Sequence, residues 1–282
     1  MKSFDIITLT VNPALDKSAH FSGLVPEQKI RCEAPLYDAG GGGINVSKAI
    51  ARLEGTSLAI LASGGPSGEV LKEILIKESI AFQVIETKNW TRESFVAVDD
   101  NTNSQYRFNF PGTAVSEIEK NEIIKVVGEL ESKFLVLSGS LREGLPVDFY
   151  QKMAEIAKTS NSKLVVDTAG EALEKVLETG AYLIKPNVGE LAKLIGVERL
   201  EMEEVNDAAK KIIAKGGAEI VVVSLGPQGA VLVTKDAYEY VPAPNVAKKS
   251  TVGAGDSMVG GMVWALSQNK SRALGDCYKS FK

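Results

Sequence analysis

The chain has 282 residues, of which 44% are hydrophobic and 24% charged, a composition typical of a globular protein with one large α/β domain or two smaller ones. Its formal net charge of −4, with lysine and arginine scattered among acidic residues, argues against nucleic acid as a partner. The two cysteines are too few for a disulfide framework or a metal cluster, and no apolar run is long enough to span a membrane. Because the N-terminus also lacks the pattern of a signal peptide, we expect a cytoplasmic protein.

Short apolar strands alternate with amphipathic helices along most of the chain, beginning with a buried strand at 6–11. The predicted strands that follow are 57–62, 134–137, 163–166, 182–185 and 219–224, and the predicted helices are 68–79, 147–158, 171–179, 189–195 and 205–214. Continuous apolar strands between helices are typical of a mostly parallel sheet covered on both faces. The sequence therefore predicts a doubly wound α/β architecture, formed by one domain over residues 1–282.

Two stretches, about 17–37 and 94–110, interrupt this alternation because they show strand patterns with no helix between them. Within the second stretch, strands at 94–98 and 105–110 flank a polar turn, which indicates a hairpin. Both insertions can form a small accessory sheet over the carboxyl ends of the main strands, where open α/β sheets bind ligands. We expect such a lid; the alternative is a pair of extended edge strands.

The segment 251–257, T-V-G-A-G-D-S, precedes an apolar helix predicted at 258–266. Small residues at a helix start expose main-chain N–H groups, and the helix dipole adds positive potential, so the spot favours anions. A carboxylate there, Asp256, can accept the proton of an attacking hydroxyl while the amides stabilise a transferring phosphoryl group. The alternative is that Asp256 is only a helix cap.

Four consecutive glycines at 40–43 lead into a helix predicted at 46–53 and allow the backbone to pass close to a ligand. The alternative is a flexible turn. The chain contains no P-loop pattern and no G-x-G-x-x-G between a strand and a helix, which argues against the usual nucleotide and dinucleotide fingerprints.

Two further segments lie at predicted strand ends. In the first, Asn187 and Glu190 have the spacing of a capping box, and they also suit a site where Glu190 holds hydrated Mg²⁺ near nucleotide phosphates. In the second, 224–229 is a glycine-punctuated turn between two strands, for which a simple hairpin is a sufficient explanation.

Single polar residues complete the candidates. Asn12 and Asp16 follow the first strand, and the predicted lid carries the cations Lys29, Arg31, Arg92 and Arg107, of which arginine suits phosphate binding. The only histidine is His20, in the predicted lid, which argues against Ser-His-Asp and Cys-His catalysis and against a histidine-based zinc site unless a partner chain contributes.

Taken in order, six motifs make the chain similar to the ribokinase/phosphofructokinase-B carbohydrate kinase family. They are N-P-A-L-D (12–16), G-G-G-G-I-N (40–45), S-G-S (138–140), K-P-N-x-x-E (185–190), S-L-G-P-Q-G (224–229) and T-V-G-A-G-D-S (251–257). Within the family, K-I-R-C (29–32), N-W-T-R (89–92) and Q-Y-R-F (105–108) resemble the bacterial 6-phosphofructokinase type 2 branch. The resemblance covers essentially the whole chain and implies ATP-dependent phosphorylation of a sugar phosphate. Fructose 6-phosphate is the first choice, and fructose 1-phosphate and tagatose 6-phosphate are the alternatives.

The resemblance also implies a role for each site residue. Asp256 is the expected base, with Gly253, Ala254 and Gly255 as the anion hole. The residues expected to bind the sugar phosphate are Asn12, Asp16, Lys29, Gly41, Gly42, Asn45, Arg92 and Ser140, some of them across a homodimer formed by interlocking lids. The residues expected to line the ATP site are Lys185, Asn187, Ser224, Gly226, Gly229 and Thr251. Glu190 is expected to organise Mg²⁺, and Ser250 and Val252 a monovalent cation such as K⁺.

The chain departs from the family pattern in two places. Leu141 to Gly144 replace the double proline usual after Ser140, which puts the charges of Arg142 and Glu143 near the substrate entrance. The sequence also ends at Lys282, before a helix and a further segment that close the adenine pocket in family members. We therefore expect a truncated chain with weakened ATP binding, and a sugar-phosphate-binding protein without turnover is an alternative. An unrelated nucleotide-binding α/β protein is disfavoured by the missing fingerprints.

Overall fold

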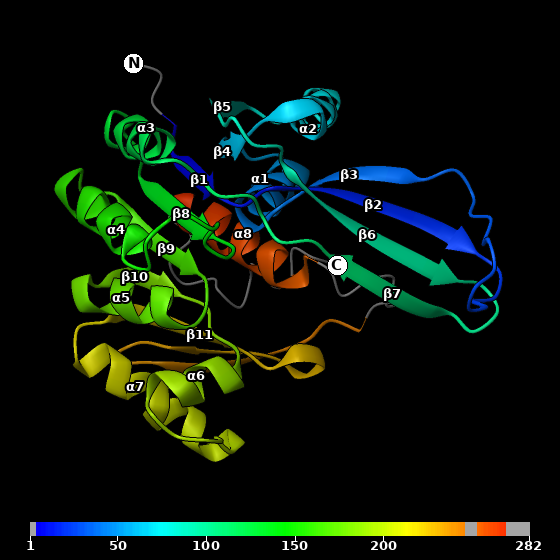
Figure 1. Cartoon of the computed structure of the whole chain (residues 1–282). Helices are drawn as coiled ribbons and strands as arrows, with labels where there is room; N and C mark the ends of the chain where they lie inside the picture. Colours follow the sequence, from blue (N-terminus) through cyan, green and yellow to red (C-terminus); the bar gives the residue numbers. More distant parts are fainter. Residues whose placement is uncertain (1–3, 246–252, 269–282) are drawn as a thin grey trace.

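The computed structural model describes residues 4–245 and 253–268 and contains a nine-stranded sheet in the order β13-β12-β11-β10-β9-β8-β1-β4-β5 (Figure 1). The strands are β1 (Ile6–Thr10), β4 (Leu58–Ser63), β5 (Phe82–Glu86), β8 (Phe134–Ser138), β9 (Lys163–Asp167), β10 (Ala181–Ile184), β11 (Ala218–Ser224), β12 (Gly229–Val233) and β13 (Tyr238–Pro242). Neighbouring strands from β11 to β5 in this order pair in parallel, whereas β12 pairs antiparallel with both β11 and β13. The predicted, mostly parallel sheet is confirmed.

Helices cover both faces of this sheet. They are α1 (Gly42–Arg52), α2 (Gly65–Lys77), α3 (Glu117–Gly128), α4 (Phe149–Thr159), α5 (Glu171–Thr179), α6 (Val188–Leu194), α7 (Val205–Ala214) and α8 (Ala254–Ser267), with short 3₁₀ turns η1 (Met202–Glu204) and η2 (Gly226–Gln228). In β1, Ile7 and Leu9 pack into the core beneath α3 to α7, while Ile6 packs into the core beneath α1 and α8. Successive side chains of a strand point to opposite faces, so a fully apolar strand supplies both cores.

A separate four-stranded sheet projects from one end of the main body (Figure 1). It has the order β3-β2-β6-β7 and consists of β2 (Ala14–Phe21), β3 (Leu36–Gly40), β6 (Arg92–Asp99) and β7 (Ser104–Asn109). Strands β6 and β7 form the hairpin that the sequence predicts, with Asp99 opposite Ser104. The accessory sheet of the predicted fold is therefore present.

Helices α1, α2 and α8 begin three or four residues earlier than predicted, and α3 was not predicted. Helix α1 starts at Gly42 and α8 at Ala254, so the small residues of both motifs form first turns rather than preceding loops. At Gly43, a Cβ atom would lie only 2.8 Å from the carbonyl oxygen of Leu9, because α1 packs closely on β1. Helix α3 carries a capping box between Ser116 and Glu119, a signal that could have revealed it. Of the helices in the described ranges, none has the length and apolar character of a transmembrane segment.

Candidate active site

The half-buried carboxylate of Asp256 lies in the first turn of α8, at the carboxyl end of β8. Its Oδ2 atom accepts a hydrogen bond of 2.9 Å from Nδ2 of Asn45, on α1, and its Oδ1 atom accepts one of 3.2 Å from Oγ of Ser138. Each carboxylate oxygen keeps a lone pair after accepting one such bond. Asp256 is therefore fixed in orientation and still able to accept a proton.

The carboxylate belongs to the same first turn of α8 as several main-chain amides. The N-cap of α8 is Gly253, in the left-handed conformation with φ of 72°, and no side chain of the described residues caps the helix. The first N–H groups of a helix have no partner within it, so Ala254 and Gly255 can donate to an anion. This arrangement combines a proton acceptor with anion-binding donors.

The glycines of the 40–43 segment make room for polar side chains. A Cβ atom at Gly42 would lie 2.2 Å from Oγ of Ser138, and one at Gly40 would lie 2.0 Å from Oδ2 of Asp16. Gly41 has φ of 119°, a conformation that other residues rarely adopt. The glycines thus allow the start of α1 to lie close to β8 and β2.

A second group of polar residues lies between β1 and the base of the small sheet. Nδ2 of Asn12 donates to Oγ of Ser140 at 3.3 Å, while its Oδ1 is buried without a partner. Nε of Arg92 is also buried without a partner, although its Nη1 donates to Oγ of Ser94 at 3.2 Å. Buried polar groups are normally hydrogen-bonded, so an unpartnered acceptor and donor here suit a ligand with hydroxyl and phosphate groups.

Asp16 belongs to the same region, because β2 pairs with β6 and sets Asp16 opposite Ser94. Burial raises the pKa of the Asp16 carboxyl, and the hydrogen bond from Ser94 and the charge of Arg92 oppose that rise. Asp16 and Arg92 thus interact electrostatically at the base of the small sheet.

Lys29 lies elsewhere in the chain. It is exposed in the β2–β3 connection, and it lines a hollow of about 390 Å³ together with His20, Arg31 and Asp100. His20 is exposed, and its Nδ1 lies 2.7 Å from Oδ1 of Asp100. Of the described residues expected to bind the sugar phosphate, only Lys29 lines this hollow, so one protomer alone does not bring Lys29 to the others.

On the other side of Asp256, Lys185 pairs with Asp167. Asp167 was not among the site residues predicted from sequence. Nζ of Lys185 lies 3.1 Å from Oδ1 of Asp167, and a Cβ atom at Gly255 would lie 3.3 Å from the same Nζ. Asp167 ends the apolar strand β9, and a polar residue at that position is the signal that could have found it. Burial raises the pKa of Asp167 to about 6; Asp256 and Glu190 contribute to the rise, and Lys185 opposes it.

This raised pKa makes a testable prediction about stability. Because the native carboxyl has a pKa of about 6 instead of 3.8, the native state binds more protons than the unfolded state between these values. The contribution of Asp167 to the stability of the wild-type protein therefore falls as the pH rises through that window. In the variant Asp167→Asn this dependence is lost, so its Tm relative to wild type should be higher at pH 7.5 than at pH 4.5 by about 2–6 °C.

The control for this comparison is Asp236→Asn, an exposed carboxylate in the β12–β13 turn. Its Tm relative to wild type should not change with pH. Loss of the Lys185 partner lowers the Tm of Asp167→Asn at both pH values, so the pH-dependent difference is the quantity to measure by differential scanning fluorimetry. If the Tm of Asp167→Asn relative to wild type were the same at pH 7.5 and pH 4.5, the carboxyl pKa of Asp167 would not be raised in the native state.

The predicted nucleotide residues form a neighbouring group. Asn187 and Glu190 form the complete capping box of α6, with both bonds at 2.9 Å. The backbone of Asn187 bridges to Ser224, whose N–H donates to the carbonyl of Pro186 at 2.9 Å. Gly226 and Gly229 follow in the β11–β12 hairpin, which is the simple turn considered from sequence. Lys185, Asn187 and the 224–229 turn are thus brought to one edge of the sheet.

The carboxylates near this edge fit a hydrated magnesium ion. Asp256 and Glu190 both act on the pKa of Asp167, which places three acidic groups in one neighbourhood. In the described ranges, no three His, Cys, Asp or Glu residues form a dedicated metal cage. Mg²⁺ often uses only one or two carboxylates with water and substrate phosphates, so this arrangement is compatible with it. Ser250, Thr251 and Val252, predicted for the cation and ATP sites, lie outside the described residues.

A larger hollow of about 790 Å³ lies at the opposite edge of the sheet, beside Lys163, Ala181 and Ala218 at the amino ends of their strands. It contains none of the predicted site residues. Ligands of open α/β sheets bind at the carboxyl ends of the strands, where Asp256 lies, so we place the active site there despite the size of this hollow.

Comparison with known proteins identifies the family of the chain. Residues 3–273 match the family described as pfkB family carbohydrate kinase. The chain belongs to the pfkB family of carbohydrate kinases. The family and the ribokinase-like fold predicted from sequence are thereby confirmed, as is a kinase activity class.

Relatives within the pfkB family include ATP-dependent 6-phosphofructokinase isozyme 2 of Escherichia coli (strain K12), which is 42% identical over 268 residues, covering 94% of this chain and 87% of that protein. 1-phosphofructokinase of Bacillus subtilis (strain 168) is 34% identical over 264 residues, covering 93% of this chain and 86% of that protein. A crystal structure of phosphofructokinase-2 from Escherichia coli in complex with fructose-6-phosphate matches with a TM-score of 0.89 and 41% identity, covering 94% of this chain and 87% of that chain.

Proposed function

We propose that this pfkB family kinase transfers the γ-phosphoryl group of ATP to fructose 6-phosphate and forms fructose 1,6-bisphosphate. The observation that carries the proposal is the Asp256 carboxylate, oriented by Asn45 and Ser138 beside the open N-terminus of α8. The 6-phosphofructokinase relative and the similar structure with fructose-6-phosphate support this substrate. The 1-phosphofructokinase relative supports fructose 1-phosphate as the alternative.

In the proposed reaction, Asp256 accepts the proton of the attacking hydroxyl. The amides of Gly253, Ala254 and Gly255 stabilise the charge that develops on the transferring phosphoryl group. Asn45 and Ser138 hold the carboxylate toward the hydroxyl, so it does not have to reorient during the reaction.

The remaining residues divide between the two substrates. Asp16, Gly41, Gly42 and Asn45 bind the sugar hydroxyls, and Asn12, Arg92, Ser140 and Lys29 bind the phosphate end. Lys185, Asn187, Ser224, Gly226, Gly229 and Thr251 bind ATP. Mg²⁺, organised by Glu190, would supply positive charge between the nucleotide phosphates, and Ser250 and Val252 would contribute to a K⁺ site.

We further propose that the chain acts as one domain whose lid insertions, about 17–37 and 94–110, join two copies in a homodimer. Large apolar side chains are exposed on the small sheet and its connections, namely Leu24, Val25, Leu36, Tyr37, Phe108 and Phe110. Exposed apolar patches of this kind are typical of interaction sites. A lid from a second copy would also bring Lys29 to the active site that lacks it.

The dimer can be tested with Tyr37→Asp, which places a charge on the apolar lid. We expect light scattering to show a shift from dimer to monomer and the KM for fructose 6-phosphate to rise, because the partner's Lys29 is lost. The control Ile118→Asp changes another exposed large side chain, which is 82% exposed on α3, and it should leave the mass unchanged. A monomeric wild-type chain would contradict the dimer.

An ADP-release assay tests the substrate. The wild-type chain should show its highest kcat/KM with fructose 6-phosphate when it is compared with fructose 1-phosphate, tagatose 6-phosphate and ribose. A higher value for another sugar would reassign the acceptor. Binding of fructose 6-phosphate in a calorimeter without any turnover over hours would instead favour a sugar-phosphate-binding protein.

A further inference from the structure

Arg142 is a buried cation directly after the S-G-S motif. Its exposed fraction is only 3%, whereas the neighbouring Glu143 is exposed, so the two do not form a charge pair at the entrance as expected from sequence. A buried guanidinium is costly unless its donors are satisfied. Its partners therefore indicate what it does.

Those partners belong to three segments that are far apart in sequence. Nε of Arg142 donates to the carbonyl oxygen of Thr113 at 2.5 Å, and Nη2 donates to Oγ1 of the same residue at 2.6 Å. Nη1 donates to the carbonyl of Ala62 at 3.2 Å, and Nη2 also reaches the carbonyl of Trp90 at 3.4 Å. One side chain thus joins the end of β4, the turn before β6 and the connection between β7 and α3.

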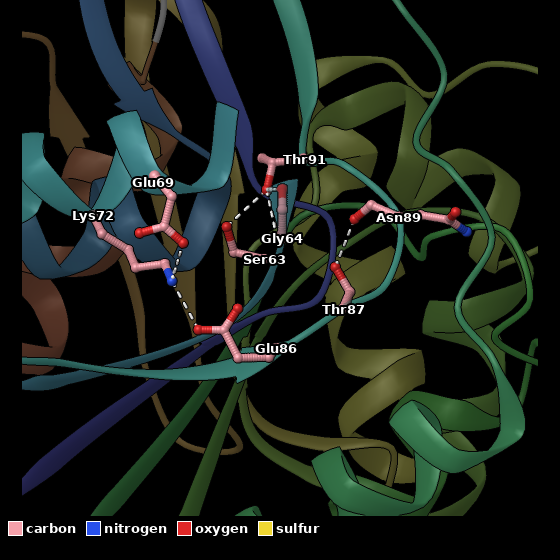
Figure 2. A network of polar contacts seen from close by, with 8 residues as sticks. All are labelled: Ser63, Gly64, Glu69, Lys72, Glu86, Thr87, Asn89 and Thr91. Carbon is pink, nitrogen blue, oxygen red and sulfur yellow. Dashed lines mark hydrogen bonds and ion pairs between the residues drawn. The ribbon is translucent and has the colours of Figure 1, made fainter. Parts of the chain in front are cut away.

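The turn at 87–91 is also held by residues at the end of β4, as Figure 2 shows. Oγ1 of Thr91 lies 2.7 Å from Oγ of Ser63 and accepts from the amide of Gly64 at 3.1 Å. Oγ1 of Thr87 donates to the carbonyl of Asn89 at 2.9 Å. Since Arg92 follows directly, the position of its guanidinium depends on this turn.

Arg142 also contacts the segment that covers Asn12. A Cβ atom at Gly112 would lie 2.5 Å from Oδ1 of Asn12 and 3.3 Å from Cγ of Arg142, so Gly112 passes tightly between the two. Burial lowers the pKa of the Arg142 guanidinium, and the negative charge of Glu119 opposes that shift. The positive charge of Arg92 is close enough to lower the same pKa further. Arg142 is therefore adjacent to the segment that contacts Asn12 and close to the charge of Arg92.

We propose that Arg142 is a positioning residue of the sugar-phosphate site, which fixes Arg92 and Asn12 by tying the 87–91 turn and the 112–113 segment to β4. The identity of the ligand rests on the proposed function, whereas the connection that Arg142 makes between the 87–91 turn, the 112–113 segment and β4 does not. Among the described residues, Arg142 has no hydrogen bond to those predicted for the nucleotide, so we expect its effect to be confined to the sugar phosphate.

The test compares Arg142→Met, which keeps the length of the side chain, with Arg142→Lys, which keeps the charge but loses the planar fork. The matched control is Arg199→Met, an arginine that is 80% exposed and paired with Glu201. In Arg142→Met we expect faster amide hydrogen exchange at 87–92 and 112–115 but not in β9 to β11. The KM for fructose 6-phosphate should rise about 10-fold, with the KM for ATP within about 2-fold of wild type, because charge-assisted hydrogen bonds are lost. Arg142→Lys should show a smaller rise.

A double variant separates positioning from a general loss of structure. If Arg142 acts through Arg92, then Arg142→Met should raise the KM much less in an Arg92→Ala background than alone. Unchanged hydrogen exchange in both segments would show that Arg142 does not hold them. Full additivity of the two substitutions in the KM for fructose 6-phosphate, or an equal rise in the KM for ATP, would overturn the positioning role. If Arg142→Met does not fold, the same readouts on Arg142→Lys decide. A wild-type chain that turns over no sugar phosphate would refute the proposed function, while hydrogen exchange would still decide whether Arg142 holds both segments.

Discussion

Replacing Asp256 with Asn should lower kcat by about 10²- to 10⁴-fold, the usual loss when a general base is removed. Asparagine has nearly the same size and can still interact with Asn45 and Ser138, but it cannot accept the hydroxyl proton. Substrate binding should change little, so the KM values for sugar phosphate and ATP should stay within a few-fold of wild type. Steady-state kinetics with saturating Mg²⁺ measure both quantities.

A matched control for this variant exists in α7. Asp207 is the third residue of its helix, as Asp256 is in α8, but it is exposed and far from the site in sequence and fold. If Asp256 were only a favourable charge at a helix start, Asp256→Asn and Asp207→Asn would each cost about 0.3–1 kcal/mol of stability and leave kcat intact. A kcat of Asp256→Asn equal to that of Asp207→Asn would remove Asp256 from the proposed role.

The sheet could be predicted from sequence because its strands are short, apolar and separated by helices. The helix starts at Gly42 and Ala254 could not, since glycine-rich stretches have low helix propensity and the penalty is offset only by close packing against β1 and β8. Strand β13 carries exposed residues at four of its five positions, so its sequence lacks a clear apolar pattern. Tertiary pairing with β12 determines it instead.

Asp256 and Asn45 were predicted because they belong to glycine-rich motifs at helix starts, whereas the contact of Ser138 with Asp256 was not predicted. Asp256, Asn45 and Ser138 meet because β8, α1 and α8 converge. The roles of Asp167 and Arg142 depend on burial and on partners distant in sequence, which no local pattern encodes. The placement of Asn187 and Glu190 in a capping box shows that a structural and a ligand-binding interpretation can share the same residues.

Removing the side chain in Arg92→Ala should raise the KM for fructose 6-phosphate by about 10- to 100-fold, the equivalent of losing charge-assisted hydrogen bonds to a phosphate. The reason lies in its geometry: Nη1 is used by Ser94, but the buried Nε has no partner and so is available to a ligand. The KM for ATP should change by less than about 3-fold, because Arg92 lies at the base of the small sheet, apart from Lys185 and the 224–229 turn.

Two companion variants make the Arg92 measurement specific. Arg92→Lys keeps a positive charge without the fork and should lose part of the affinity. Arg199→Ala removes an exposed arginine elsewhere and should behave as wild type. Equal rises in both KM values for Arg92→Ala would indicate a general distortion of the site. An unchanged KM for every sugar phosphate would instead show that the unpartnered Nε faces no phosphate, and the sugar-phosphate end of the site would have to be placed elsewhere.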